Sequence, residues 1–260
     1  MGRDKVDRTG ERSCNNFGSE MIIVKCNNAR DIDVYFPQYD WIARNKQYNH
    51  FKNGKISCPY EPRVFGVGYI GEGEYKVWEN CKSTRAYKSW NHMLERCYSD
   101  KFHKRNPTYE DCEIDESFHN FQNFGYWDEN NYYQIEGERM HLDKDILHKG
   151  NKIYSPETCI YVPQTINSLF IKRQNDRGES AIGTSPHKCG KYTVYCSLIN
   201  PETGKSKSEY LGLYDTQEKG FEIYKYYKER NIKQVADYYK GQIPEKLYIA
   251  LYNYEVEIDD

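Results

Sequence analysis

Alternating apolar and polar positions predict short strands in the first third of the chain. Residues 21–24 form an apolar run, and within 31–36 the side chains of Ile32, Val34 and Phe36 recur at every second position. Glycines scattered among aromatic residues in 51–73 are typical of tight turns. We therefore expect a small β-rich accessory module over residues 1–81.

The segment 140–170 predicts a strand, a loop, a second strand and a helix. Period-two alternation over residues 140–146 places three polar side chains on one face: His141, Asp143 and Asp145. Residues 159–162 form the second predicted strand, and a helix begins just past Pro163. Potential metal-binding or proton-handling groups therefore line one face of the first strand.

The last third predicts a hairpin followed directly by a helix. Residues 192–199 and 208–214 alternate as strands around a glycine-containing turn at 201–205. Asp215 and Glu218 are spaced as a capping box at the start of the helix. A second, shorter helix is expected to start at Asn231 and to end near Gly241 and Pro244.

Residues 84–170 resemble the HNH-type endonucleases common in bacteriophages and mobile elements. Upstream of the hairpin, the family's aromatic helix with a Trp, a Met and an Arg-Cys pair is similar to the run from Trp90 to Cys97. The family's hairpin pattern is matched by Leu142, Asp143, Lys144, Asp145, Asn151, Tyr154, Pro156, Cys159, Gln164 and Asn167. The resemblance implies metal-dependent DNA nicking or cleavage with Mg²⁺ or Mn²⁺.

The resemblance also implies roles for individual residues. The divalent ion would be held by Asp143 and Asn167, with Asp145 beside them, and would stabilise the leaving oxygen of a phosphodiester. The family's general-base His is replaced by Lys144, whose ordinary pKa of about 10.4 does not suit a base at neutral pH. His141 or His148 would then activate the water. Alternatively, the two aspartates and Asn167 only cap and cross-brace the hairpin.

Residues 190–216 resemble the ethylene-response-factor (Apetala-type) DNA-binding domain. The match lies in the run from Gly190 to Tyr192 and in the Tyr-Leu-Gly-Leu-Tyr-Asp-Thr run at 210–216. The resemblance implies a three-stranded sheet in the major groove of double-stranded DNA. Phosphate contacts would come from Lys188, Lys191, Lys205 and Lys207. Tyr192, Tyr195 and Ser197, together with Thr193, stand where that family reads bases with Arg and Trp.

Together these patterns predict a multi-domain α+β protein. The β-rich module at 1–81 is followed by an HNH-like helical and ββα module at 82–172. An Apetala-type domain at 173–260 adds a three-stranded sheet, helices and an acidic tail. The joints are expected at 81–84 and at 172–180, the second of which is polar and glycine-containing.

Charge is distributed unevenly along the middle of the chain. Residues 82–108 carry seven basic and two acidic side chains, whereas residues 110–145 carry eleven acidic and two basic ones. One surface should therefore attract phosphate and its neighbour repel it. Without a metal ion, the acidic stretch suits a basic partner protein, and the 26 tyrosines offer contact surface for such a partner.

Three functions remain open on these grounds. The first, slightly preferred, is a phage-type DNA endonuclease, and the second is a DNA-binding regulator whose HNH-like part is an inactive scaffold that needs no cofactor. The third is a phage counter-defence protein that binds and blocks a host protein. The sequence has no apolar run near the ~20 residues of a membrane span, no signal peptide and no CxxC pair, which favours a cytoplasmic protein with reduced thiols.

Overall fold

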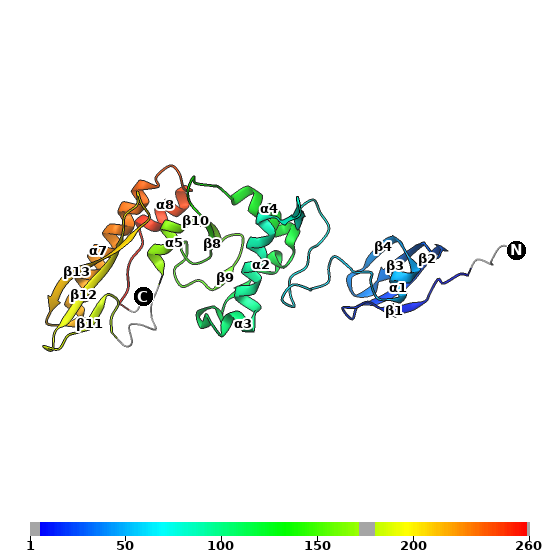
Figure 1. Cartoon of the computed structure of the whole chain (residues 1–260), viewed down its shortest axis with the longest axis horizontal. Coiled ribbons are helices and arrows are strands. Elements are labelled where there is room, and N and C mark those ends of the chain that lie inside the picture. Colours follow the sequence, from blue (N-terminus) through cyan, green and yellow to red (C-terminus); the bar gives the residue numbers. More distant parts are fainter. Residues whose placement is uncertain (1–5, 172–179, 259–260) are drawn as a thin grey trace. The chain divides into compact units, whose positions relative to one another are not determined.

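The computed structural model describes residues 6–171 and 180–258, which form a multi-domain α+β protein with several small sheets (Figure 1). Two compact units make up the chain. The first contains residues 1–130 and 153–156, and the second contains 131–152 and 157–260. The division runs through the predicted middle segment, so the strands of the 140–163 hairpin belong to the second unit.

The first unit begins with a four-stranded antiparallel sheet. Its strands follow chain order: β1 (Arg12–Cys14), β2 (Glu20–Asn28), β3 (Asp31–Phe36) and β4 (Trp41–Lys46). A 3-10 turn, η1 (Pro37–Tyr39), links β3 to β4, and α1 (Tyr48–Lys52) places Phe51 in the core. Ile32, Val34 and Phe36 are fully buried on one face of β3, which confirms the predicted alternation.

The rest of the first unit packs short helices around aromatic side chains. Its elements are the hairpin β5 (Trp78–Glu79) and β6 (Lys82–Ser83), α2 (Arg85–Tyr98), α3 (Asp100–His103), η2 (Pro107–Tyr109), β7 (Glu113–Ile114), η3 (Glu116–His119) and α4 (Phe121–Asn131). The buried Trp90 of α2 donates its Nε1–H to the carbonyl of Phe118 at 2.6 Å. β9 (Ile153–Tyr154) pairs in parallel with β7. The predicted joint at 81–84 thus lies inside this unit, partly within a hairpin.

The second unit starts with an antiparallel pair of strands. β8 (Met140–Asp143) pairs with β10 (Ile160–Pro163), and α5 (Gln164–Asn167) with η4 (Ser168–Phe170) follows Pro163 as predicted. The first strand is shorter than predicted. It ends at Asp143 because the Oδ1 atom of that residue accepts the backbone N–H groups of Asp145 and Ile146, at 2.9 and 2.8 Å, and turns the chain.

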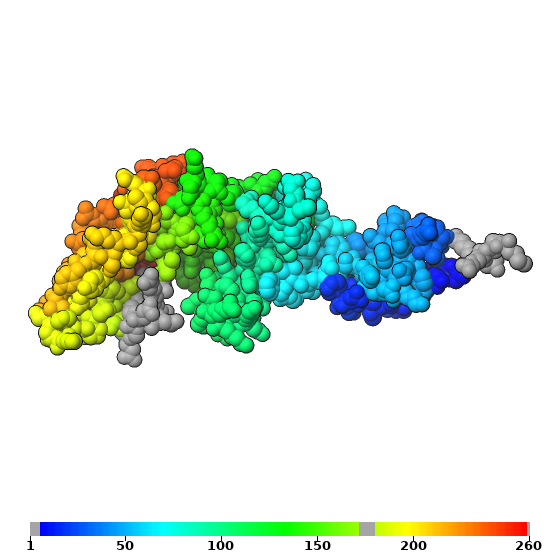
Figure 2. Space-filling view, in the orientation of Figure 1, coloured from blue at the N-terminus to red at the C-terminus, as the bar shows by residue number. Residues whose placement is uncertain are grey.

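A three-stranded antiparallel sheet packed on a long helix completes the unit. The order is β11 (Thr184–Pro186), β12 (Tyr192–Ile199) and β13 (Ser206–Tyr214), and α7 (Gln217–Tyr238) covers one face. α8 (Glu245–Tyr252) packs on α7. Figure 2 shows β12 and β13 in yellow beside α7 in orange as one packed body. The predicted joint at 172–180 lies outside the described residues except for Ser180.

Two details of the predicted helices are wrong. The N-cap of α7 is Thr216, whose hydroxyl accepts the N–H of Lys219, and Asp215 instead pairs with Lys191. No second helix starts at Asn231, because α7 runs through that position to Tyr238. The helix continues because Ile232, Val235 and Ala236 extend its buried face. The Asn231 side chain does not cap a helix but bonds to the backbone of Ile199.

The Asn231 amide takes the place of a neighbouring strand at the end of β12. Its Oδ1 accepts the N–H of Ile199 and its Nδ2 donates to the carbonyl of Ile199, both at 2.8 Å. Asn231 is 4% exposed and Ile199 is also 4% exposed. Buried backbone groups need hydrogen-bond partners. The pairing of β11 with β12 extends only to Val194 and does not reach Ile199. One side chain therefore ties the sheet to the middle of α7.

We expect Asn231→Ala to destabilise the second unit by about 2–4 kcal/mol, because two buried backbone groups lose their partners at about 1–2 kcal/mol each. Urea denaturation followed by circular dichroism measures the change. Gln234→Ala, an exposed position on the same helix, is the matched control and should shift stability by less than about 0.5 kcal/mol. Equal stabilities of the two variants would contradict the role given to Asn231.

Candidate functional site

The carboxylate of Asp143 lies at the end of β8, on an apolar face of the hairpin. Asp143 pairs with Ile160, and His141 pairs with Val162. Cross-strand partners share a face of the sheet, and both Ile160 and Val162 belong to the hydrophobic core of this unit. The predicted shared face of His141 and Asp143 is therefore present, but it packs against the core instead of facing open solvent.

This setting raises the pKa of Asp143 to about 6. Burial is the main cause, and the nearby charge of Asp145 adds to it, because both disfavour the ionised carboxylate. The two backbone N–H groups that the carboxylate accepts act in the opposite direction. Asp143 is thus a carboxyl group whose charge at neutral pH is poorly compensated by the residues around it.

Lys144 is buried and closes the loop that follows β8. Its Nζ donates to the carbonyl of Asn151 at 3.1 Å, and the Asn151 Nδ2 donates back to the carbonyl of Lys144 at 2.7 Å. A second Nζ contact, at 3.4 Å, reaches the Asp145 carboxylate. Lys144, which the resemblance to HNH endonucleases would place at the general-base position, therefore braces the loop by its bonds with Asn151.

The other residues expected around the metal ion are spread over several elements. Asp145 lies beyond the end of β8 and is exposed, His148 is exposed in the following loop, and Asn167 is the last residue of α5. Within the described ranges, no group of three or more His, Cys, Asp or Glu side chains is placed to hold a metal ion. A divalent ion held by several acidic ligands does not fit this donor set, and metal-dependent cleavage stays a prediction from the resemblance.

The second candidate site is the sheet face that turns away from α7. Val194 and Cys196 are fully buried under the helix, so alternation places their neighbours on the open face. Tyr195 pairs with Tyr210 across the strands, and their rings lie 5.4 Å apart with 50% and 58% of each residue exposed. The remaining exposed or partly exposed members of this face, which we call the open face, are Ser185, Thr193, Ser197, Ser206, Ser208 and Leu213; Ile199 has the same parity but is buried.

Apart from Leu213, the exposed members of the open face carry polar groups, and none of the described members is charged. Its hydroxyl groups donate and accept hydrogen bonds, and the Oγ atoms of Ser197 and Ser206 already contact each other at 2.6 Å. Tyr192 belongs to the opposite parity of β12 and lies on the side of the sheet that faces α7. Of the side chains expected to read bases, Tyr195, Ser197 and Thr193 therefore share the open face, whereas Tyr192 does not.

Lysines flank the open face at both ends of β12. Lys188 and Lys191 lie in the turn between β11 and β12, and Lys205 lies in the opposite turn. Lys207 is the second residue of β13 and pairs with Leu198, which places it on the side of the sheet that faces α7. Two of the four are ion-paired, since the Nζ of Lys191 lies 2.8 Å from Asp215 and that of Lys207 lies 3.7 Å from Glu209. Both pairs are at the surface, where such pairs are weak and exchange readily for another anion.

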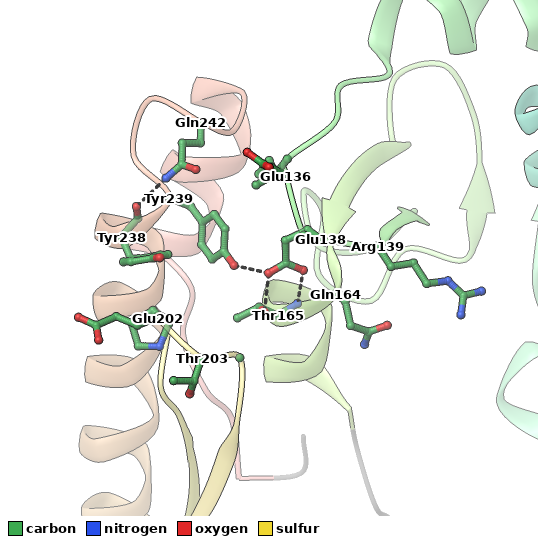
Figure 3. A pocket seen from close by; sticks show the side chains of 14 residues that line it. Glu136, Glu138, Arg139, Gln164, Thr165, Glu202, Thr203, Tyr238, Tyr239 and Gln242 are labelled. Atoms are coloured by element: carbon green, nitrogen blue, oxygen red, sulfur yellow. Dashed lines mark hydrogen bonds between the residues drawn. The ribbon is translucent and has the colours of Figure 1, made fainter.

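A hollow of about 500 Å³ beside α7 contains acidic groups that the sequence analysis missed. The carboxylate of Glu138 points between Thr165 and Tyr239, accepting the Thr165 Oγ1–H at 2.7 Å and the Tyr239 hydroxyl (Figure 3). Burial and this hydrogen bond raise the pKa of Tyr239 to about 12. Glu138 lies in an irregular segment before β8, so no periodic pattern indicated its contact with α7.

Comparison of the chain with models of protein families, with curated proteins and with solved structures finds no match. None of the helices among the described residues is long and apolar enough to cross a membrane.

We expect Asp143→Asn to stabilise the protein above pH 6. A pKa raised from 3.8 to about 6 means that the neutral carboxyl favours folding below pH 4, and this contribution is lost as pH rises through 6. The asparagine keeps the Oδ1 acceptor without the charge, so the gain at pH 7.5 should reach about 1–3 kcal/mol. Urea denaturation from pH 4 to pH 8 measures it. The exposed Asp111→Asn is the control, and parallel pH profiles of wild type and Asp143→Asn would refute the assignment.

Proposed function

We propose that the protein binds double-stranded DNA through the open face of the β11–β13 sheet. The observation that carries this proposal is an uncharged face of hydroxyls and tyrosines with lysines at both ends of its central strand. The major groove admits a β-ribbon, and base edges there offer hydrogen-bond donors, acceptors and the thymine methyl group. Side chains such as Tyr195 and Ser197 suit these edges, whereas acidic groups on the face would have opposed them.

The lysines supply the part of the affinity that is independent of sequence. Each phosphate neutralised by a lysine releases counterions, so the observed affinity falls as salt rises. Lys188 and Lys205 have no ion-pair partner within the described ranges, while Lys191 would exchange the Asp215 carboxylate for a phosphate. Lys207, expected to contact phosphate, lies on the other face of the sheet. Three such contacts correspond to a slope of about −2.7 in a plot of log affinity against log salt.

The conformation of the HNH-like hairpin favours the regulator or scaffold over the nuclease. Lys144 is engaged with Asn151, Asp145 lies beyond the end of β8, and Asp143 accepts two backbone N–H groups. These are the cross-bracing roles that the alternative interpretation of the hairpin predicts. Cleavage of DNA and binding of a host protein stay predictions. The second of these rests on the acidic stretch at 110–145, which suits a basic partner protein.

Replacing both Tyr195 and Tyr210 by Ala should weaken binding to a short duplex at least tenfold, because each good contact to a base contributes about 1–3 kcal/mol. Fluorescence anisotropy with a labelled duplex, at several salt concentrations, measures the change. Tyr226→Ala, which removes a tyrosine of similar exposure from α7, is the matched control. Unchanged affinity in the double variant, with α7 and sheet intact by circular dichroism, would rule out the open face.

Replacing Lys188 and Lys205 by Gln should lower the steepness of the salt dependence by about 1.8, because two phosphate contacts are lost. The same anisotropy titrations yield this slope. Sequence preference should change little, since phosphate contacts carry no direct sequence information. An unaltered slope would exclude these lysines from the interface.

Incubation of supercoiled DNA with the protein and magnesium or manganese separates binding from cleavage. The DNA-binding proposal expects retarded but intact DNA. Relaxed or linear products that form with wild type and vanish with Asp143→Asn would instead establish the endonuclease hypothesis. The Tyr195 and Tyr210 double variant is the second control, because it should lose retardation in either case.

A further inference from the structure

A groove of about 680 Å³ runs along the β11 side of β12, where the sheet is incomplete. Its lining includes Ser185, Tyr195, Ser197 and Ser208 from the strands, and Tyr224 and Lys228 from α7. Of the described side chains that line it, Lys228 alone carries a charge. The groove therefore combines one cation with a set of hydroxyl groups and the edge of an aromatic ring.

The backbone of Ser197 adds a hydrogen-bonding edge to this groove. The pairing of β11 with β12 ends at Val194, and the Tyr195 N–H then reaches the carbonyl of Gly183 at 3.0 Å. Asn231 holds the N–H and the carbonyl of Ile199 on this same edge. Backbone groups alternate between the two edges of a strand, so the N–H and carbonyl of Ser197 also point to this side.

Lys228 is partly buried beside the groove. No carboxylate lies within ion-pair distance of its Nζ among the described residues. Burial lowers the pKa of Lys228, and the nearby Cys196 thiol opposes this shift only weakly. A desolvated cation without a partner destabilises the folded state. Such groups occur at binding sites, where the ligand supplies the missing charge.

We propose that this groove binds a small phosphate-bearing molecule, with Lys228 and the Ser197 N–H as donors to the phosphate. Several hydroxyl donors suit a phosphate, which offers several acceptor oxygens, better than they suit a halide. The exposed ring of Tyr195 borders the groove and provides a surface on which a nucleobase can stack. A mononucleotide therefore matches both parts of the groove.

The test compares full-length wild type with Lys228→Met, which keeps the aliphatic stem of the side chain and removes its charge. Inorganic phosphate and adenosine monophosphate are the probes, with sodium chloride of equal ionic strength as the reference. We expect both probes to raise the melting temperature of wild type. Lys228→Met should melt at a higher temperature than wild type without ligand, gain nothing from either probe, and bind the nucleotide at least fivefold more weakly by isothermal titration calorimetry.

Lys225→Met is the matched control, because Lys225 lies on the same helix outside the groove and pairs with Glu229. This variant should respond to both probes as wild type does. No thermal response in wild type, or an equal response in Lys228→Met, would overturn the proposal.

A phosphate could also come from the backbone of bound DNA, and duplex affinity separates the two sources. A free nucleotide site predicts that Lys228→Met binds duplex DNA within about twofold of wild type. Loss of DNA affinity in Lys228→Met, without any response of wild type to the two small probes, would overturn the small-molecule site and assign Lys228 to DNA contact. If the Tyr195 and Tyr210 double variant bound DNA as tightly as wild type, the proposed DNA-binding function would be rejected. The small-molecule site would still be tested by the response of wild type and Lys228→Met to the two probes.

Discussion

The second unit depends on how closely α7 approaches the β11–β13 sheet. Gly220 makes that approach possible, because a Cβ atom at this position would lie 3.0 Å from the Val194 side chain. Near the start of β11, Gly183 allows the ring of Tyr224 to lie against the backbone. Farther along the helix, Asn231 bonds to both backbone groups of Ile199. Because α7 covers one face of the sheet, the hydroxyl groups and tyrosines on the other face of β12 and β13 stay uncovered by this helix.

The two candidate sites differ in how their polar groups are compensated. In the hairpin, Lys144 and Asn151 bond to each other's main chain, and the Asp143 carboxylate is partly satisfied by backbone N–H groups. Such contacts stabilise a local conformation. On the open face, by contrast, the tyrosine rings remain half exposed, and the turn lysines make at most surface ion pairs. Groups of this kind are available to an external ligand.

Sequence patterns predicted regular elements well and long-range contacts poorly. The strands at 31–36 and 192–199 follow from alternation, because a face that packs on a core must be apolar at every second position. The strand at 140–146 was predicted too long, since alternation does not reveal that the Asp143 side chain turns the backbone. The sequence pattern also predicts a helix start at Asn231, which is wrong because α7 runs through that residue. The partner of Asn231, Ile199, is 32 residues away, and no local pattern contains such a contact.

The amide of Asn231 also determines what can join the β11-side edge of β12. An exposed strand edge invites pairing with another extended chain, and such pairing needs several consecutive backbone groups. Here the edge of β12 is occupied by β11 and Gly183 up to Tyr195, and by Asn231 at Ile199. Only the backbone groups of one residue, Ser197, lie between them on that edge. This edge of β12 is thereby closed to the addition of another strand, while a gap wide enough for a single small ligand stays accessible.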